Sequence, residues 1–109
     1  MIDRLSSLAR DRGGALCVGI DPVLDQLPSH LGGGVEAARR YCFELIEATA
    51  PFACAFKANA AFFEAMGSAG WQLLEEVIEV AGRYALVIVD GKRGDVGHTA
   101  DAYARAVFE

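Results

Sequence analysis

Three short apolar runs, separated by stretches with helical periodicity, constrain the fold of this chain more than any other feature. The runs cover residues 15–20, 52–56 and 85–89, and each is typical of a strand. Apolar residues at helical spacing fill 35–49 and 68–82. Strands that alternate with helices in this way predict an α/β fold with a parallel sheet and right-handed crossovers.

Helix-forming and helix-breaking residues set the remaining expected boundaries. A leading helix is expected over 3–10, ended by Gly13 and Gly14, and Pro22 should end the first strand because it lacks a backbone N–H. Residues 23–34 are expected to be a loop, and 59–66 a short helix. Ser68 is expected to cap the helix that follows, and Thr99 to cap a last one. The third apolar run contains no polar residue, which predicts a fully buried strand.

A charged residue stands at the end of each predicted strand: Asp21, Lys57 and Asp90. In parallel α/β sheets, binding sites form at the carboxyl ends of the strands. The third strand is followed at once by the charged segment Asp90-Gly91-Lys92-Arg93-Gly94-Asp95. Asp90 and Lys92 are two residues apart, so in extended backbone their side chains project to the same side. This concentration of charge directly after an apolar strand predicts a functional site.

Each of these charged residues also has a purely structural interpretation. Asp21 could serve as a turn residue before Pro22, and Lys57 could extend its ammonium group from a strand end into solvent. Asp90 and Lys92 could form an exposed ion pair of little energetic value. The occurrence of all these residues at three successive strand ends favours the functional interpretation.

The composition excludes several classes of protein. The chain has 109 residues, of which 53% are hydrophobic and 23% charged, as is typical of a globular domain. Its net charge of −5, with basic residues interspersed among acidic ones, disfavours a nucleic-acid partner. No apolar run reaches the roughly 18 residues that a membrane span needs. The segment Met1-Ile2-Asp3-Arg4 is too polar for a secretory signal peptide.

The cysteines and histidines predict neither disulfides nor a metal site. Cys17, Cys42 and Cys54 are odd in number and include no Cys-x-x-Cys pair, so they are expected to be buried free thiols in a reducing cytoplasm. His30 and His98 have no partners at the spacing of metal ligands.

Three sequence strings resemble orotidine 5'-phosphate decarboxylases, in particular the branch of that family found largely in bacteria. They are LCVGIDP around Asp21, FKANAAFFE around Lys57, and DGKRGDVGHTA after the third strand. The family carries Asp-x-Lys-x-x-Asp at the end of its third barrel strand. The resemblance runs from about Asp3 to the last residue, and His98 departs from it, since the family often has a small polar residue there.

The resemblance implies the N-terminal part of a (β/α)8 TIM barrel. Residues 1–109 would form one partial domain, with a leading helix and about three βα units, truncated at its C-terminus. Loops that hold the substrate phosphate late in the family's barrel have no counterpart here. The isolated chain is therefore expected to be inactive and poorly folded.

The activity implied by the resemblance is the decarboxylation of orotidine 5'-monophosphate to UMP in pyrimidine biosynthesis, without metal or cofactor. Lys92 would protonate the C6 carbanion, and Asp90 would lie near the departing carboxylate. The resemblance further implies a homodimer in which two residues act on the partner's site. The implied catalytic residues are Lys92, Asp90, Asp95 and Lys57; the implied substrate-binding residues are Asp21, Lys57, Thr99 and Asn59; the residues acting in trans are Asp95 and Thr99.

Two alternative functions remain open at this point. Keto-sugar-phosphate decarboxylases and hexulose-phosphate synthases share the Asp-x-Lys-x-x-Asp skeleton but use Mg²⁺, and they have an acid where this chain has Lys57. A lysine at that position would repel the metal. The other alternative is a non-catalytic binding or dimerising module, which would fit a chain without a phosphate site.

Overall fold

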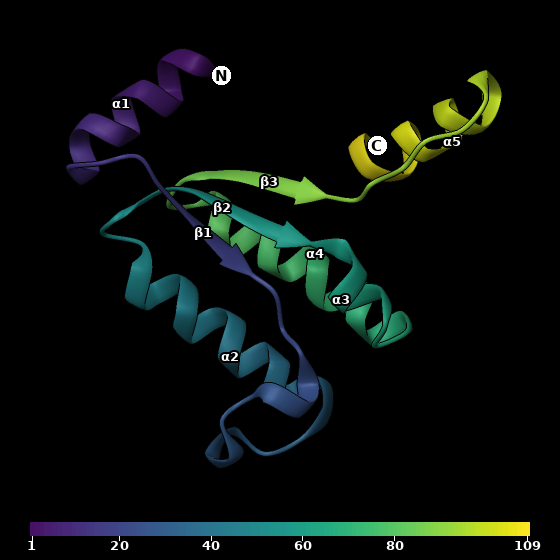
Figure 1. The fold of residues 1–109 in the computed structure, drawn as a ribbon, viewed down its shortest axis with the longest axis horizontal. Coiled ribbons are helices and arrows are strands. Elements are labelled where there is room, and N and C mark those ends of the chain that lie inside the picture. Colours follow the sequence, from purple (N-terminus) through teal and green to yellow (C-terminus); the bar gives the residue numbers. More distant parts are fainter.

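The computed structural model describes residues 1–109 as a three-stranded parallel sheet in the order β1-β2-β3, flanked by helices (Figure 1). Strand and helix alternate along the chain after a leading helix, which confirms the expected α/β class. The elements are α1 Ile2–Arg12, β1 Leu16–Ile20, the short 3₁₀ helices η1 Leu24–Gln26 and η2 Ser29–Leu31, α2 Gly34–Thr49, β2 Ala53–Asn59, α3 Ala60–Glu64, α4 Ser68–Gly82, β3 Leu86–Asp90 and α5 Gly97–Phe108.

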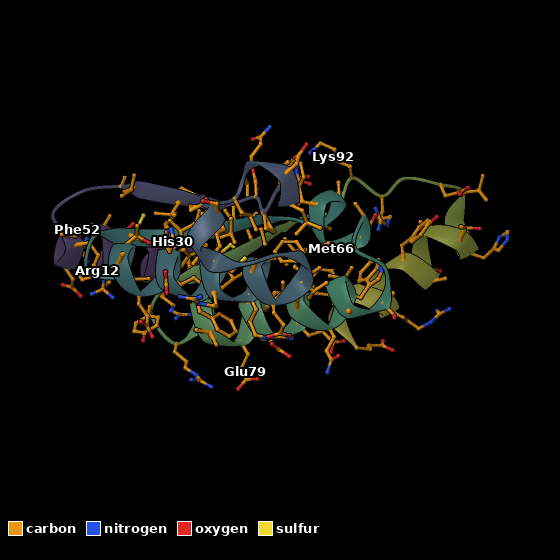
Figure 2. All side chains as sticks on the ribbon, turned by 90° about the horizontal axis from the view of Figure 1, so that it is seen from below. Arg12, His30, Phe52, Met66, Glu79 and Lys92 are labelled. Atoms are coloured by element: carbon orange, nitrogen blue, oxygen red, sulfur yellow. The ribbon has the colours of Figure 1, made fainter.

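One face of the sheet carries the hydrophobic core. Val18, Phe56 and Val87 form one row across the three strands, and Ile20, Ala58 and Val89 form the next. These side chains pack with apolar residues of α2 and α4 in one cluster, in which Phe56, Ile46, Leu73 and Val77 are fully buried. Figure 2 shows the sheet above this helix layer, with Glu79 of α4 on the far side. No helix combines the length and the apolar character that crossing a membrane requires.

The opposite face of the sheet lies open in this chain. Gly19, Lys57 and Ile88 form a row on that face, and Ile88 is 48% exposed. The prediction that the third strand is fully buried is therefore wrong. β3 is an edge strand, and helices cover only one of its two faces. Cys17 is likewise exposed rather than buried, whereas Cys42 and Cys54 are buried free thiols as predicted.

Three expected boundaries need correction. β2 continues to Asn59, so Lys57 lies inside the strand, because Phe56 and Ala58 go on alternating into the core. Ser68 does not cap α4; the N-cap is Gly67, whose φ of +74° is a conformation that glycine adopts most easily. Thr99 does not cap α5, because that helix already begins at Gly97.

Other boundary predictions are confirmed. Gly13 ends α1 in the left-handed conformation, with a φ of +79°. The first strand ends at Ile20, two residues before Pro22, and the last residue of α4 is Gly82. The expected loop over 23–34 contains the two short 3₁₀ helices, and its last residue, Gly34, already begins α2.

Candidate active site

The charged residues from the three strands lie on the open face, at the carboxyl ends. Lys57 is in register with Gly19 and Ile88, and Asn59 is in register with Asp90 one row further along. Asp21 directly follows β1. Its Oδ2 lies 4.0 Å from the point where a Cβ on Gly19 would stand, so its carboxylate belongs to the same face. The parallel strands thus bring residues from three distant segments to one edge.

Asp90, the last residue of the outer strand β3, forms an ion pair with Lys92 at this edge. Lys92 Nζ donates a hydrogen bond to Asp90 Oδ2. The Asp90 side chain is 23% exposed and that of Lys92 is 74% exposed. Figure 2 shows Lys92 on the upper side of the sheet, well away from Phe52, which lies at one end of the molecule. The i,i+2 spacing predicted that the two side chains share a side, and they do.

Two positive charges act on the carboxylate of Asp90. The hydrogen bond from Lys92 lowers its pKa, partial burial opposes that effect, and the charges of Lys92 and Lys57 lower the pKa further. Asp90 is therefore ionised at neutral pH. One negative charge therefore lies under the influence of two ammonium groups.

The backbone of Lys92 is in an uncommon conformation. Its φ of +47° makes it the one residue other than glycine with a positive φ in this chain. Such a conformation is strained for a lysine, and it persists where the surrounding structure holds it in place. Nothing in the residue type signals this, so the sequence could not predict it.

Asn59 has a structural role as well. As N-cap of α3, its Oδ1 accepts the backbone N–H of Ala61 at 3.2 Å. Its amide NH₂ makes no hydrogen bond within the chain and is available to donate to a bound molecule.

The structure does not bring Asp95 and Thr99 to Lys92 within the chain. Asp95 Oδ1 accepts the backbone N–H of Val96 at 2.7 Å, and no ion pair joins Asp95 to Lys92. Thr99 is the third residue of α5 and is half-buried. Asp90, Lys92 and Lys57 therefore form the group, and the second acid of the motif stands apart from it.

Arg93 makes contacts that sequence reasoning missed. Its guanidinium pairs with Glu64 of α3 and donates to the carbonyl of Gly91. It also lies 5.6 Å from the centre of the Tyr103 ring in α5. Glu64 and Arg93 are 29 residues apart, so no local pattern signals the pair.

Of the two hollows in the surface, only the smaller one includes a residue of the charged edge, Lys92. One of about 290 Å³ lies between the loop and α5, lined in part by Lys92, Arg93 and Tyr103. A larger, mainly apolar one of about 1060 Å³ lies between α4, β3 and α5. No three His, Cys, Asp or Glu side chains gather into a group that could hold a metal ion.

Comparisons with known proteins connect this geometry to one family. An orotidine 5'-phosphate decarboxylase from Roseiflexus sp. (strain RS-1) is 44% identical over 107 residues, which are 98% of this chain and 39% of that protein. One from Herpetosiphon aurantiacus is 41% identical, over 99% of this chain and 40% of that protein. The solved structure of Leishmania donovani OMP decarboxylase superimposes with a TM-score of 0.82 and 42% identity, over 99% of this chain and 39% of that one.

The extent of these matches defines what is shared. The chain spans about 40% of the length of the curated relatives it matches. Its fold corresponds to the N-terminal part of their barrel, which confirms the expected partial (β/α)8 architecture. The family model for orotidine 5'-phosphate decarboxylase / HUMPS proteins matches residues 14–109. The chain belongs to the orotidine 5'-phosphate decarboxylase / HUMPS family.

Proposed function

We propose that this chain forms the first part of an enzyme that decarboxylates orotidine 5'-monophosphate to UMP. The observation that carries the proposal is the Lys92–Asp90 ion pair, with Lys57 beside it, at the carboxyl ends of the strands. In the reaction, the bond between C6 and the carboxylate breaks, CO₂ leaves, and the electron pair stays on C6. An ammonium group fixed beside C6 stabilises that charge and then supplies the proton.

The three central residues have complementary roles in this proposal. Lys92 is the proton donor, and Asp90 holds its ammonium while placing negative charge near the departing carboxylate. Because the pKa of Asp90 is lowered, that charge is present throughout the neutral pH range. Lys57 adds a second ammonium on the same side of the sheet.

The same geometry disfavours the Mg²⁺-dependent alternative. A metal ion approaching Asp90 would meet the ammonium groups of Lys57 and Lys92, which already neutralise that carboxylate. Mg²⁺ is bound through oxygen ligands, and two lysines would repel it. The proposed enzyme therefore uses neither metal nor cofactor.

The residues around the central group would bind the substrate. Asp21 and Lys57 would hold the ribose hydroxyls, since both project from neighbouring strands onto the open face. The free amide NH₂ of Asn59, one row beyond Lys57, would donate to an oxygen of the substrate. These assignments extend the resemblance residue by residue to side chains that share one edge.

A substitution of Lys92 tests the proposal. The isolated chain lacks most of a barrel, so the test uses a hybrid protein in which residues 1–109 replace the matching part of the Roseiflexus relative. The hybrid protein should convert orotidine 5'-monophosphate to UMP without added metal and in the presence of EDTA. Lys92→Ala should lower kcat by several orders of magnitude, because the proton donor and the partner of the carbanion are removed together. A Lys92→Ala variant within tenfold of the unsubstituted hybrid protein would contradict the assignment.

We also propose that the site is shared across a homodimer, with Asp95 and Thr99 acting on the partner's substrate. The support is that Asp95 is exposed and unpaired with its own Lys92, although only three residues separate them. A two-fold axis presents the same loop in both directions, so each subunit gives and receives a residue.

The cytoplasmic location expected from the cysteines stays a prediction.

Subunit exchange distinguishes the shared site from an Asp95 that acts in its own subunit. Inactive Lys92→Ala and Asp95→Ala hybrid proteins are mixed after their subunits have been shown to exchange. If Asp95 acts in trans, each heterodimer has one intact site, and random mixing restores about a quarter of all sites. If Asp95 acts in cis, every site keeps one lesion and no activity returns, which would overturn the shared site.

A further inference from the structure

The charged loop after β3 is tied to the rest of the molecule through a single side chain. Within residues 91–96, Lys92 pairs with Asp90 and Asp95 bonds to Val96, and both contacts are local. Of these side chains, only that of Arg93 makes a hydrogen bond, ion pair or cation–π contact beyond the adjacent strand β3, with Glu64 of α3 and the ring of Tyr103 in α5. No other side-chain hydrogen bond or ion pair joins the loop to α3 or α5.

These contacts of Arg93 lie next to Lys92, the residue whose backbone must be held in place. Lys92 has a φ of +47°, a strained conformation that surrounding contacts must maintain. Arg93 follows it directly and also donates to the carbonyl of Gly91, so its guanidinium holds the loop on both sides of Lys92. The Arg93 and Glu64 side chains are only 33% and 30% exposed, which shields this ion pair better than a fully solvated one.

Glu64, the ion-pair partner of Arg93, is held in place by the core. Glu64 is the last residue of α3, and its neighbour Phe63 is fully buried. The helix starts at the Asn59 cap, which is in register with Asp90. The contact with Glu64 therefore fixes the position of the loop relative to the strands that carry Lys57 and Asp90.

We infer that Arg93 is a positioning residue, which holds the strained backbone of Lys92 through Glu64 and Tyr103 and so aims the Lys92 ammonium group at the reacting carbon. The inference rests on the proposed function for its catalytic consequence, but the geometry of the loop can be measured without it. Arg93 acts through Lys92 and does not itself contact the substrate.

The kinetic test uses Arg93→Met in the hybrid protein, which removes the guanidinium and keeps the length of the side chain. We expect kcat to fall about 10- to 100-fold with KM changed less than about threefold, because a proton donor displaced by about 1 Å loses rate rather than affinity. Glu64→Gln, which is nearly isosteric, should cause a loss of similar size, and the double variant should lose no more than the worse single variant. Arg93→Lys should recover part of the rate, since lysine keeps the positive charge but lacks the planar guanidinium group.

The matched control is Arg83→Met. It removes another Arg–Glu ion pair, formed at 2.9 Å between Arg83, just after α4, and Glu79 within that helix; the two side chains are 64% and 72% exposed. This variant should keep kcat unchanged. A loss of rate in Arg83→Met equal to that in Arg93→Met would show a general effect of removing an arginine and would overturn the inference.

A measurement independent of activity separates failure of this inference from failure of the proposed function. The carboxyl carbon of Asp90, followed by NMR as pH is lowered, reports its hydrogen bond with Lys92. If Arg93 positions Lys92, the pKa of Asp90 should rise toward its ordinary 3.8 in Arg93→Met and in Glu64→Gln but not in Arg83→Met. An unchanged Asp90 titration, or kcat within threefold in both variants, refutes the inference. An inactive hybrid protein refutes the proposed function, and the titration still decides about Arg93.

Discussion

At Gly70 of α4 there is no room for a side chain, so Gly70→Ala should lower the stability of the protein by an amount that the packing allows us to predict. A Cβ at this position would stand 1.9 Å from the carbonyl oxygen of Phe63 and 2.7 Å from the Cβ of Met66. Ordinary van der Waals contact begins at 3.4 Å, and the first obstacle is backbone rather than the end of a flexible side chain. In Gly70→Ala, α4 and α3 must therefore separate by more than about 1 Å.

The expected cost follows from the packing at this contact. Phe63 and Leu73, on either side of it, are fully buried, so the separation loosens a close-packed region. Overpacking of this kind costs about 1–3 kcal/mol in the free energy of unfolding. For a domain the size of the hybrid protein, that lowers Tm by about 2–12 °C. Activity should fall as well, because α3 carries Glu64.

Gly82→Ala is the matched control for this substitution. It lies at the other end of the same helix, where a Cβ would meet only Val87 Cγ2 at 3.9 Å. That variant should be neutral or more stable by up to about 1 kcal/mol, since alanine is the better helix former. Thermal and urea unfolding of both variants decide the matter. Equal stability of Gly70→Ala and Gly82→Ala would refute the argument from close approach.

Three further predictions follow from the structure. The pKa of the Asp90 carboxyl should lie below 3.8 and should rise in Lys92→Ala, as measured by NMR. The contribution of this carboxylate to stability is then complete above pH 3.8 and is lost as pH falls through the lowered pKa of the folded state. The isolated chain should show no cooperative monomeric melt, because Ile88 is 48% and Phe108 86% exposed and the outer edges of β1 and β3 are unpaired; a sharp melt at a monomer's mass would contradict this. Burial raises the pKa of Cys42 to about 12, so its thiol should resist alkylation at pH 8 in the folded hybrid protein until the protein unfolds.

The order of the elements could be predicted because its causes are local. Apolar spacing distinguishes the strands from the helices, and Gly13 adopts the left-handed conformation that ends α1. The end of β2 could not be predicted from Lys57, because a charged residue does not by itself end a strand. Lys57 can lie inside the strand because its side of the sheet lies open in this chain, while the alternation of Phe56 and Ala58 continues into the core.

The candidate site was predictable only where its contacts are short in sequence. Asp90 and Lys92 are two residues apart, and their spacing predicted that their side chains share a side, although Lys92 does not have the extended backbone on which that prediction rests. The Arg93–Glu64 pair depends on where α3 returns to the loop, which no local pattern records. The positive φ of Lys92 is a property of the folded loop, since lysine has no preference for that conformation.

These features converge on α3, which links the packing of the core to the direction of Lys92. A helix of five residues is not stable by itself in water, because its first hydrogen-bonded turn costs more entropy than so few bonds return. It persists here because Asn59 caps its start, Phe63 buries its middle, and Gly70 lets α4 approach its backbone. Each of these contacts also fixes Glu64, and through it the loop that carries Lys92. A substitution in the core at Gly70 and one in the loop at Arg93 should therefore disturb the same ammonium group, although neither residue would touch the substrate.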